Sequence, residues 1–88
     1  MIRVRYDPHT PLLSVEGHAG AGRKGQDIIC AGVSALVIAL ERAAPGIVGD
    51  GFALFTGGEK AAYRVVAGGL SALAERYPEH IKMTGGRK

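Results

Sequence analysis

The sequence predicts an α+β fold, a two-layer sandwich in which two helices cover one face of a mainly antiparallel sheet. Residues 2–6 alternate apolar and polar side chains, which is the pattern of a half-buried strand, and further short stretches bounded by turn residues are also predicted to be strands. Longer apolar stretches that end at proline or glycine are typical of helices. These segments give the order β-β-α-β-β-α, and 88 residues are enough for one domain over residues 1–88.

The first two strands are expected to form an antiparallel hairpin. Residues 2–6 place Ile2, Val4 and Tyr6 on one face of a strand and two arginines on the other. The next five residues, Asp-Pro-His-Thr-Pro, are typical of a turn. Residues 12–18 then form the returning strand, which ends at a histidine.

A glycine-rich segment and the first helix follow the hairpin. Residues 19–26 hold three glycines and two alanines, so we expect a mobile loop. The helix is expected to run from Asp27, a good N-cap, to about Ala43, and Pro45-Gly46 ends it. Because this helix is apolar on most faces, we expect it to be buried against the sheet and at a subunit interface.

The second half of the chain is expected to add two strands and a helix. Residues 51–56 and 60–66 are predicted to be strands joined by a glycine pair at 57–58. A second helix is predicted from about residue 70 to residue 77, where a proline stops it. Residues 81–84 could add a short final strand.

The net charge of +3 is mildly basic, and its small clusters are most simply solvated strand faces and tails. Aromatic residues do not interleave with the basic ones along the sequence, so we expect no direct, specific binding of nucleic acid. The N-terminus lacks an apolar signal core, and the longest apolar run, residues 28–40, is shorter than the ~20 residues of a membrane span. We therefore expect a cytoplasmic protein without a membrane partner.

Cys30 and His18 are the residues best suited to catalysis. Cys30 is the only cysteine of the chain and lies in the first turn of the expected helix, where partial positive charge favours a thiolate. His18 ends the preceding strand, from which its imidazole can accept the thiol proton. Taken alone, a helical cysteine can equally be an inert packing residue, so both interpretations stand at this point.

The same region resembles the ribosomal-processing cysteine proteases of the Prp family. The match rests on the spacing of Gly17, His18, Asp27, Cys30 and Ser34, and it extends over nearly the whole chain. It implies a cysteine endopeptidase that removes an N-terminal extension from a large-subunit ribosomal protein. It also implies that Cys30 is the nucleophile and His18 the general base and acid, with bulky apolar substrate residues before the cut.

Three further positions are expected to support the site. Asp27 caps the helix and so fixes where Cys30 points, and the resemblance also assigns it to the active site. Ser34 follows Cys30 by one helical turn and therefore shares its face, where the resemblance implies a supporting role. Gly17 allows the backbone to approach a substrate closely.

Gly20, Gly22 and Gly25 fall in a G-x-G-x-x-G pattern that also occurs in dinucleotide-binding turns. The chain is too short for a doubly wound domain, and the preceding strand belongs to a hairpin. We therefore expect these glycines to form a flap over a peptide substrate. One cysteine and three scattered histidines give no metal-ligand spacing, so we expect neither a metal nor a cofactor.

The alanine-rich core and the apolar first helix favour a homodimer. Two other functions remain open at this stage. One is a non-enzymatic, ribosome-associated assembly module in which Cys30 is structural. The other is a thiol redox protein, which would need a resolving thiol from another molecule.

Overall fold

The computed structural model describes residues 1–17 and 28–85, which form five strands and two helices. In chain order these are β1 (Ile2–Asp7), β2 (Leu12–Glu16), α1 (Ile28–Glu41), β3 (Gly46–Gly49), β4 (Phe52–Thr56), α2 (Lys60–Arg76) and β5 (Ile81–Thr84). The order β-β-α-β-β-α and the α+β class are confirmed, and β5 adds the short final strand.

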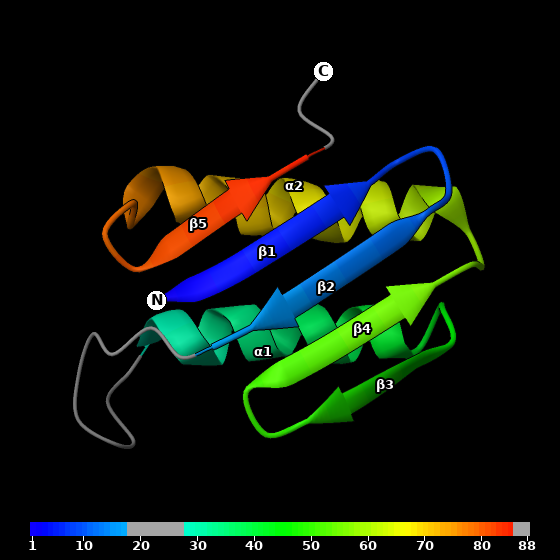
Figure 1. The fold of residues 1–88 in the computed structure, drawn as a ribbon, viewed down its shortest axis with the longest axis horizontal. Helices are drawn as coiled ribbons and strands as arrows, with labels where there is room; N and C mark the ends of the chain where they lie inside the picture. Colours follow the sequence, from blue (N-terminus) through cyan, green and yellow to red (C-terminus); the bar gives the residue numbers. More distant parts are fainter. Residues whose placement is uncertain (18–27, 86–88) are drawn as a thin grey trace.

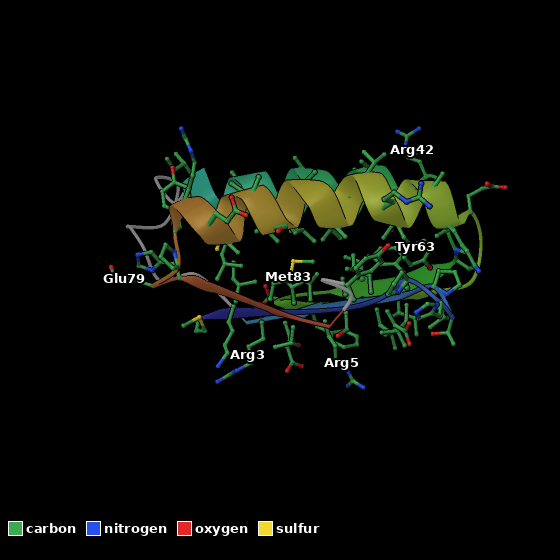
Figure 2. All side chains as sticks on the ribbon, turned by 90° about the horizontal axis from the view of Figure 1, so that it is seen from above. Arg3, Arg5, Arg42, Tyr63, Glu79 and Met83 are labelled. Atoms are coloured by element: carbon green, nitrogen blue, oxygen red, sulfur yellow. The ribbon has the colours of Figure 1, made fainter. Side chains whose placement is uncertain are left out.

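The five strands form one sheet in the order β3-β4-β2-β1-β5 (Figure 1). Neighbouring strands are antiparallel except β1 and β5, which pair in parallel, so the sheet is mainly antiparallel as expected. Both helices lie on the same face of the sheet, as the edge-on view in Figure 2 shows. The other face has no layer over it in the part of the chain that the structure describes.

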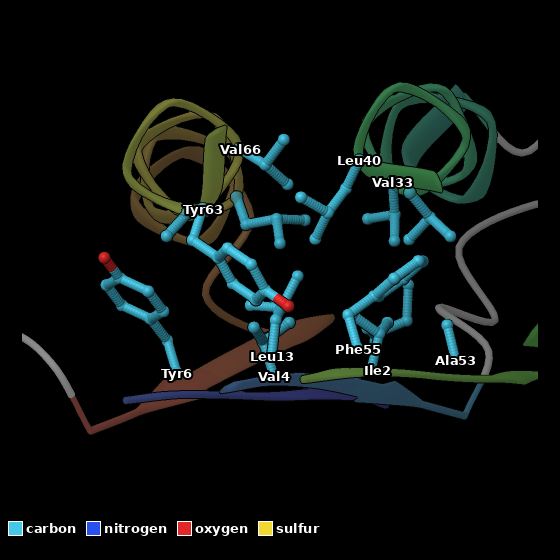
Figure 3. Packing of buried hydrophobic residues seen from close by; sticks show 14 of the residues in the cluster. Ile2, Val4, Tyr6, Leu13, Val33, Leu40, Ala53, Phe55, Tyr63 and Val66 are labelled. Carbon is cyan, nitrogen blue, oxygen red and sulfur yellow. The ribbon is translucent and has the colours of Figure 1, made fainter. Parts of the chain in front are cut away.

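The alternation in β1 decides which side chains enter the core. Ile2 and Val4 are buried beneath the helices, whereas Arg3 and Arg5 are exposed on the open face. On β4 the buried residues are Ala53 and Phe55, which face the helices in the same way (Figure 3). Burying this apolar layer gives the sandwich its main driving force, since stability follows the apolar area removed from water.

The helix predicted from Asp27 to about Ala43 is present as α1. Its residues 29, 33, 37 and 40 are buried, a spacing of three and four that forms one core-facing stripe. Beyond Glu41, the amides of Ala43 and Ala44 both donate to the Leu40 carbonyl at 2.9 Å, which closes the last turn. The proline–glycine pair that follows then leads the chain into β3.

The prediction of a strand over residues 60–66 is wrong, because these residues begin α2. Tyr63, Val66 and Leu70 are all buried and recur at helical spacing. The β-branched residues in this stretch suggested a strand, but a single buried stripe against the sheet and α1 overrides that weak propensity. The predicted start of the helix near residue 70 is therefore ten residues late.

Gly69 lies within α2 and permits its close approach to α1, which explains why glycine there does not mark a boundary. A Cβ at this position would stand 2.9 Å from Cδ2 of Leu36, on the neighbouring helix. The two helices pack side by side above the sheet (Figure 3). Gly69 directly precedes the predicted helix start near residue 70, and it is instead a contact point between the two helices.

The sequence prediction also missed β3. Residues 46–49 pair with β4, so the expected hairpin between two strands at 57–58 is instead the connection from β4 to α2. Every residue of β3 is exposed, including Ile47 and Val48. A four-residue edge strand without alternating burial gives no period-two signal, which is why the pattern did not reveal it.

No helix in residues 1–17 and 28–85 is both long and apolar enough to cross a membrane.

Candidate active site

Cys30 is the third residue of α1 as the structure defines that helix. It is half-buried and packs against the edge of the hydrophobic core, so its sulfur stands between the core and solvent. In the first turn of a helix the backbone amides lack partners within the helix, and the helix dipole adds partial positive charge. Cys30 therefore occupies a position that favours a thiolate and can still meet a ligand.

A groove of about 270 Å³ opens beside Cys30 on the helix side of the sheet. One wall is α1 and the other is the β3–β4 hairpin, with residues of β1 and β2 between them. The described residues that line it are Ile2, Val15, Gly17, Cys30, Val33, Ser34, Val37, Ile38, Val48, Gly49, Asp50, Gly51, Phe52 and Ala53. Most of these are apolar, so the groove suits an extended peptide with apolar side chains.

Ser34 lines the same groove one helical turn beyond Cys30. Because helical side chains lean toward the N-terminus, the Ser34 hydroxyl is directed toward the turn that carries the cysteine. The wall continues along α1 with Ile38, which is 55% exposed. Polar and nucleophilic groups thus lie at one end of this wall, and an exposed apolar side chain lies at the other.

Gly17 joins the end of β2 to the opposite wall of the groove. Its N–H donates to the Gly51 carbonyl at 2.9 Å, which ties it to the β3–β4 turn. Its φ of +95° is in the region that favours glycine, and a Cβ there would collide with the Met1 carbonyl oxygen. Only glycine fits this junction, and the next residue in the sequence is His18.

Of the expected site residues, the structure brings Gly17, Cys30 and Ser34 together around one groove. The other expected members, His18 and Asp27, lie outside the described residues. The same holds for the predicted flap over 19–26, with Gly20, Gly22 and Gly25. Their roles stay predictions from the sequence.

The sequence prediction missed the second wall of the groove. Val48 and Asp50 come from the β3–β4 hairpin, whose turn is Asp50-Gly51 with Gly51 at a φ of +69°. An Asp-Gly pair between two apolar stretches is a strong signal for a tight hairpin, so the sequence did carry the information. Asp50 also places a carboxylate at the groove, where it can meet a positively charged or amide group of a ligand.

Among the described residues, no group of three or more histidine, cysteine or acidic side chains could hold a metal ion. The polar groups that the structure places at the groove are a thiol, a hydroxyl and a carboxylate. These suit nucleophilic chemistry on a bound peptide.

Comparison with known proteins places these features in a wider context. The family model described as cysteine protease Prp matches residues 1–82. No curated protein matches the chain. Similar crystal structures include an essential ribosomal processing protease Prp from S. aureus in complex with a covalently linked product peptide, with 23% sequence identity and a TM-score of 0.82. That similarity covers 98% of this chain and 100% of the S. aureus chain.

Two further solved structures share the fold. The S. aureus protease in complex with a substrate peptide has 22% identity and a TM-score of 0.74, over 98% of this chain and 100% of that one. The protein SMU.848 from Streptococcus mutans has 25% identity and a TM-score of 0.60, over 96% and 90% of the two chains. The likeness in each case extends over the whole sandwich, including the part that carries the groove.

Proposed function

This chain belongs to the cysteine protease Prp family, and from that membership we propose that it is an endopeptidase that removes an N-terminal extension from a large-subunit ribosomal protein. The observation that carries the proposal is the position of the single cysteine, in the first turn of α1 and on the wall of an apolar groove. The similar S. aureus protease is described as a ribosomal processing enzyme and holds substrate and product peptides, which supports a peptide substrate here.

The chemistry begins with the thiol of Cys30. In the proposed mechanism His18 accepts the thiol proton, and the sulfur attacks the carbonyl carbon of the scissile peptide bond. Backbone amides of the first turn of α1 can stabilise the negative oxygen of the tetrahedral intermediate. The intermediate collapses when the His18 imidazolium gives its proton to the leaving amine. This step breaks the C–N bond and leaves a thioester on Cys30.

Hydrolysis of the thioester completes the cycle. A water molecule gives a proton to His18 as its oxygen attacks the thioester carbonyl, and the C–S bond then breaks. The expelled sulfur recovers a proton, and the cleaved extension leaves with a new carboxyl group. Asp27 and Ser34 are assigned supporting roles: Asp27 is expected from the sequence to cap the helix, and Ser34 lies one turn from Cys30.

The apolar walls of the groove support a substrate with bulky apolar residues before the cut. Val48 and Ile38 stand on opposite walls and are 43% and 55% exposed, so a bound side chain would remove both from water. We assign the predicted flap over 19–26 the task of covering the peptide. Contacts with substrate can offset the backbone entropy lost when such a glycine-rich segment is ordered.

We also propose that the protein acts as a homodimer in the cytoplasm. Ile28 and Val65 are 70% and 73% exposed on the helices, and a monomer leaves that apolar surface in water. Light scattering at micromolar concentration should therefore show twice the 9.1 kDa mass of one chain.

The direct test is cleavage of a ribosomal protein that carries its N-terminal extension, followed by mass spectrometry of both fragments. The wild-type protein should cut once, whereas Cys30→Ala and Cys30→Ser should show no cleavage and an unchanged thermal midpoint. His18→Ala should lose at least a hundredfold in rate, because general base catalysis contributes about 10²–10⁴-fold.

His9→Ala is the matched control for His18→Ala. His9 is exposed in the β1–β2 turn, and it is its backbone N–H, not its imidazole, that donates to Asp7 at 2.9 Å. This control should cleave at the wild-type rate. Cleavage by either Cys30 variant would refute the nucleophile assignment, and a wild-type protein that leaves the extension intact would refute the substrate.

A further inference from the structure

The open face of the sheet, on the side away from the helices and from the groove, carries a compact basic patch. Arg3 and Arg5 project from β1 on this side, as Figure 2 shows, and Lys82 is exposed on the neighbouring strand β5. We call Arg3, Arg5 and Lys82 the basic sheet patch. It belongs to a different surface from the one that holds Cys30, because the groove residues Ile2 and Val15 face the helices.

Strand register brings the three cations close together. Arg3 pairs with Lys82 across the parallel β1–β5 ladder, which places their Cα atoms about 4.8 Å apart. Arg5 lies two residues farther along β1, roughly 6.6 Å from Arg3. None of the three forms an ion pair with a carboxylate in the described part of the chain. Like charges held this closely repel one another, and an anionic ligand would relieve that repulsion.

Hydroxyl and carboxylate groups border the cations. Arg5 lies between Ser14 on β2 and Thr84 on β5, and Arg3 pairs with Glu16 on β2. Glu16 is exposed and would oppose a ligand made only of phosphate. A ribose 2′-hydroxyl, however, can donate to this carboxylate while neighbouring phosphates meet the cations. The mixture therefore fits an RNA backbone better than it fits a uniformly anionic chain.

An aromatic residue continues the line of cross-strand partners that runs from Lys82 through Arg3 to Glu16. Phe52 pairs with Glu16 across the β2–β4 ladder and is 42% exposed. Since Ala53 and Phe55 face the helices, the alternation along β4 directs the Phe52 side chain to the open face, although residue 52 also borders the groove beside the β3–β4 turn. A sheet surface with an exposed ring beside basic side chains can stack a base and hold its phosphates.

We propose that this open face binds single-stranded RNA, with the basic sheet patch on the phosphates and Phe52 against a base. Phosphate contacts carry no sequence information, so the binding is independent of sequence. It also leaves the Cys30 end of the groove free, because the basic sheet patch lies on the opposite side of the sheet and the two surfaces share only Phe52. The protein could thus hold RNA and a peptide at the same time, whatever peptide the groove accepts.

The experiment is fluorescence anisotropy of a labelled oligouridine RNA titrated with the full chain at several salt concentrations. The test variant is Arg3→Gln/Arg5→Gln/Lys82→Gln. The matched control, Arg42→Gln/Arg64→Gln/Arg76→Gln, removes the same charge from exposed positions at and near the helices. We expect the test variant to bind at least tenfold more weakly and the control to change less than threefold. The salt slope should fall by about 2 in the test variant, at roughly 0.7 per phosphate contact.

Several results would overturn the proposal. They are absence of binding by the wild-type chain, an equal loss in both triple variants, and equal affinity for oligothymidine DNA, which lacks the 2′-hydroxyl. Tighter binding of polyglutamate than of RNA would instead indicate an acidic protein partner and would also refute it. Thermal unfolding must show both variants folded, and Phe52→Leu provides a second arm, in which RNA affinity should fall at least threefold. None of these readouts depends on protease activity.

Discussion

The two ends of the sheet differ in how completely they cover their apolar residues. Under α2, the side chains of Tyr63 and Leu70 are 0% exposed and Ile81 on β5 is 2% exposed. At the β3 end, Ile47 and Val48 are 67% and 43% exposed. The apolar side chains at the α2 end are therefore fully buried, whereas the β3 end leaves apolar surface exposed to water beside Cys30. The difference separates the part of the molecule that stabilises the fold from the part that is open to a ligand.

The position of β3 in the sheet explains this difference. It is an edge strand of four residues, and its one neighbour in the described sheet is β4. At the other end of the sheet, β5 is the next element after α2 and pairs with β1. The helix and the strand therefore bury the same group of apolar side chains, which includes Leu70 and Ile81. An exposed apolar patch beside a groove is typical of a binding surface.

The largest effect on stability is expected from Leu70→Ala at the α2 end. Leu70 is fully buried, and removing its side chain leaves a cavity that the packed core cannot refill. We expect the free energy of unfolding to fall by about 2–5 kcal/mol. Urea denaturation followed by circular dichroism measures this change.

Val48→Ala is the matched variant at the groove end. Because Val48 is already 43% exposed, the same measurement should show a loss of less than about 1 kcal/mol. Its KM for the extended ribosomal protein should instead rise, since the groove loses apolar surface. Comparable destabilisation by the two variants would show that the two ends do not differ as described.

A smaller effect, opposite in sign, is expected from Tyr63→Phe. The Tyr63 hydroxyl is buried without a hydrogen-bond partner among the described residues, and its ring lies between α2 and the sheet (Figure 3). Removing an unsatisfied buried hydroxyl should raise the free energy of unfolding by about 1 kcal/mol. The measurement is again urea denaturation at neutral pH.

The same variant should also change the response to alkali. Burial raises the pKa of Tyr63 above its ordinary value of 10.0, so the unfolded chain releases this proton at a lower pH than the folded one. The associated stability is present below about pH 10 and is lost as pH rises beyond it. Wild-type stability should therefore fall more steeply above pH 10 than that of Tyr63→Phe. Equal slopes would indicate that the hydroxyl is solvated in the folded state.

The sequence predicted the fold where local patterns and tertiary contacts agree. The alternation in residues 2–6 and the apolar stretch of α1 each indicate which face of the element is buried. Both elements were predicted correctly. The errors are confined to the region from β3 to α2. There the edge strand lacks a buried face, and Gly69 allows the contact between the helices instead of marking the start of one. Neither property can be read from a local window, because each depends on a neighbour distant in sequence.

The site divides in the same way. Cys30 and Ser34 share a helical face, a relation that the spacing of four residues determines by itself. The Asp50-Gly51 pair signals the hairpin of the opposite wall, but its position beside α1 depends on how β4 pairs with β2, a long-range contact that no local pattern encodes. The close fit of Gly17 against Met1 is likewise a long-range property.

The central claim is that Cys30 is an activated nucleophile, and its alkylation rate tests this most directly. The chain has a single thiol, so mass spectrometry after brief iodoacetamide treatment reports on Cys30 alone. We predict that the folded protein reacts faster than the urea-unfolded chain near neutral pH. As the pH is raised, the alkylation rate of the folded protein should also reach half its maximum at a pH well below the ordinary thiol pKa of about 8.5. A folded protein that reacts more slowly than the unfolded chain at every pH would show Cys30 to be a packing residue and would contradict the account.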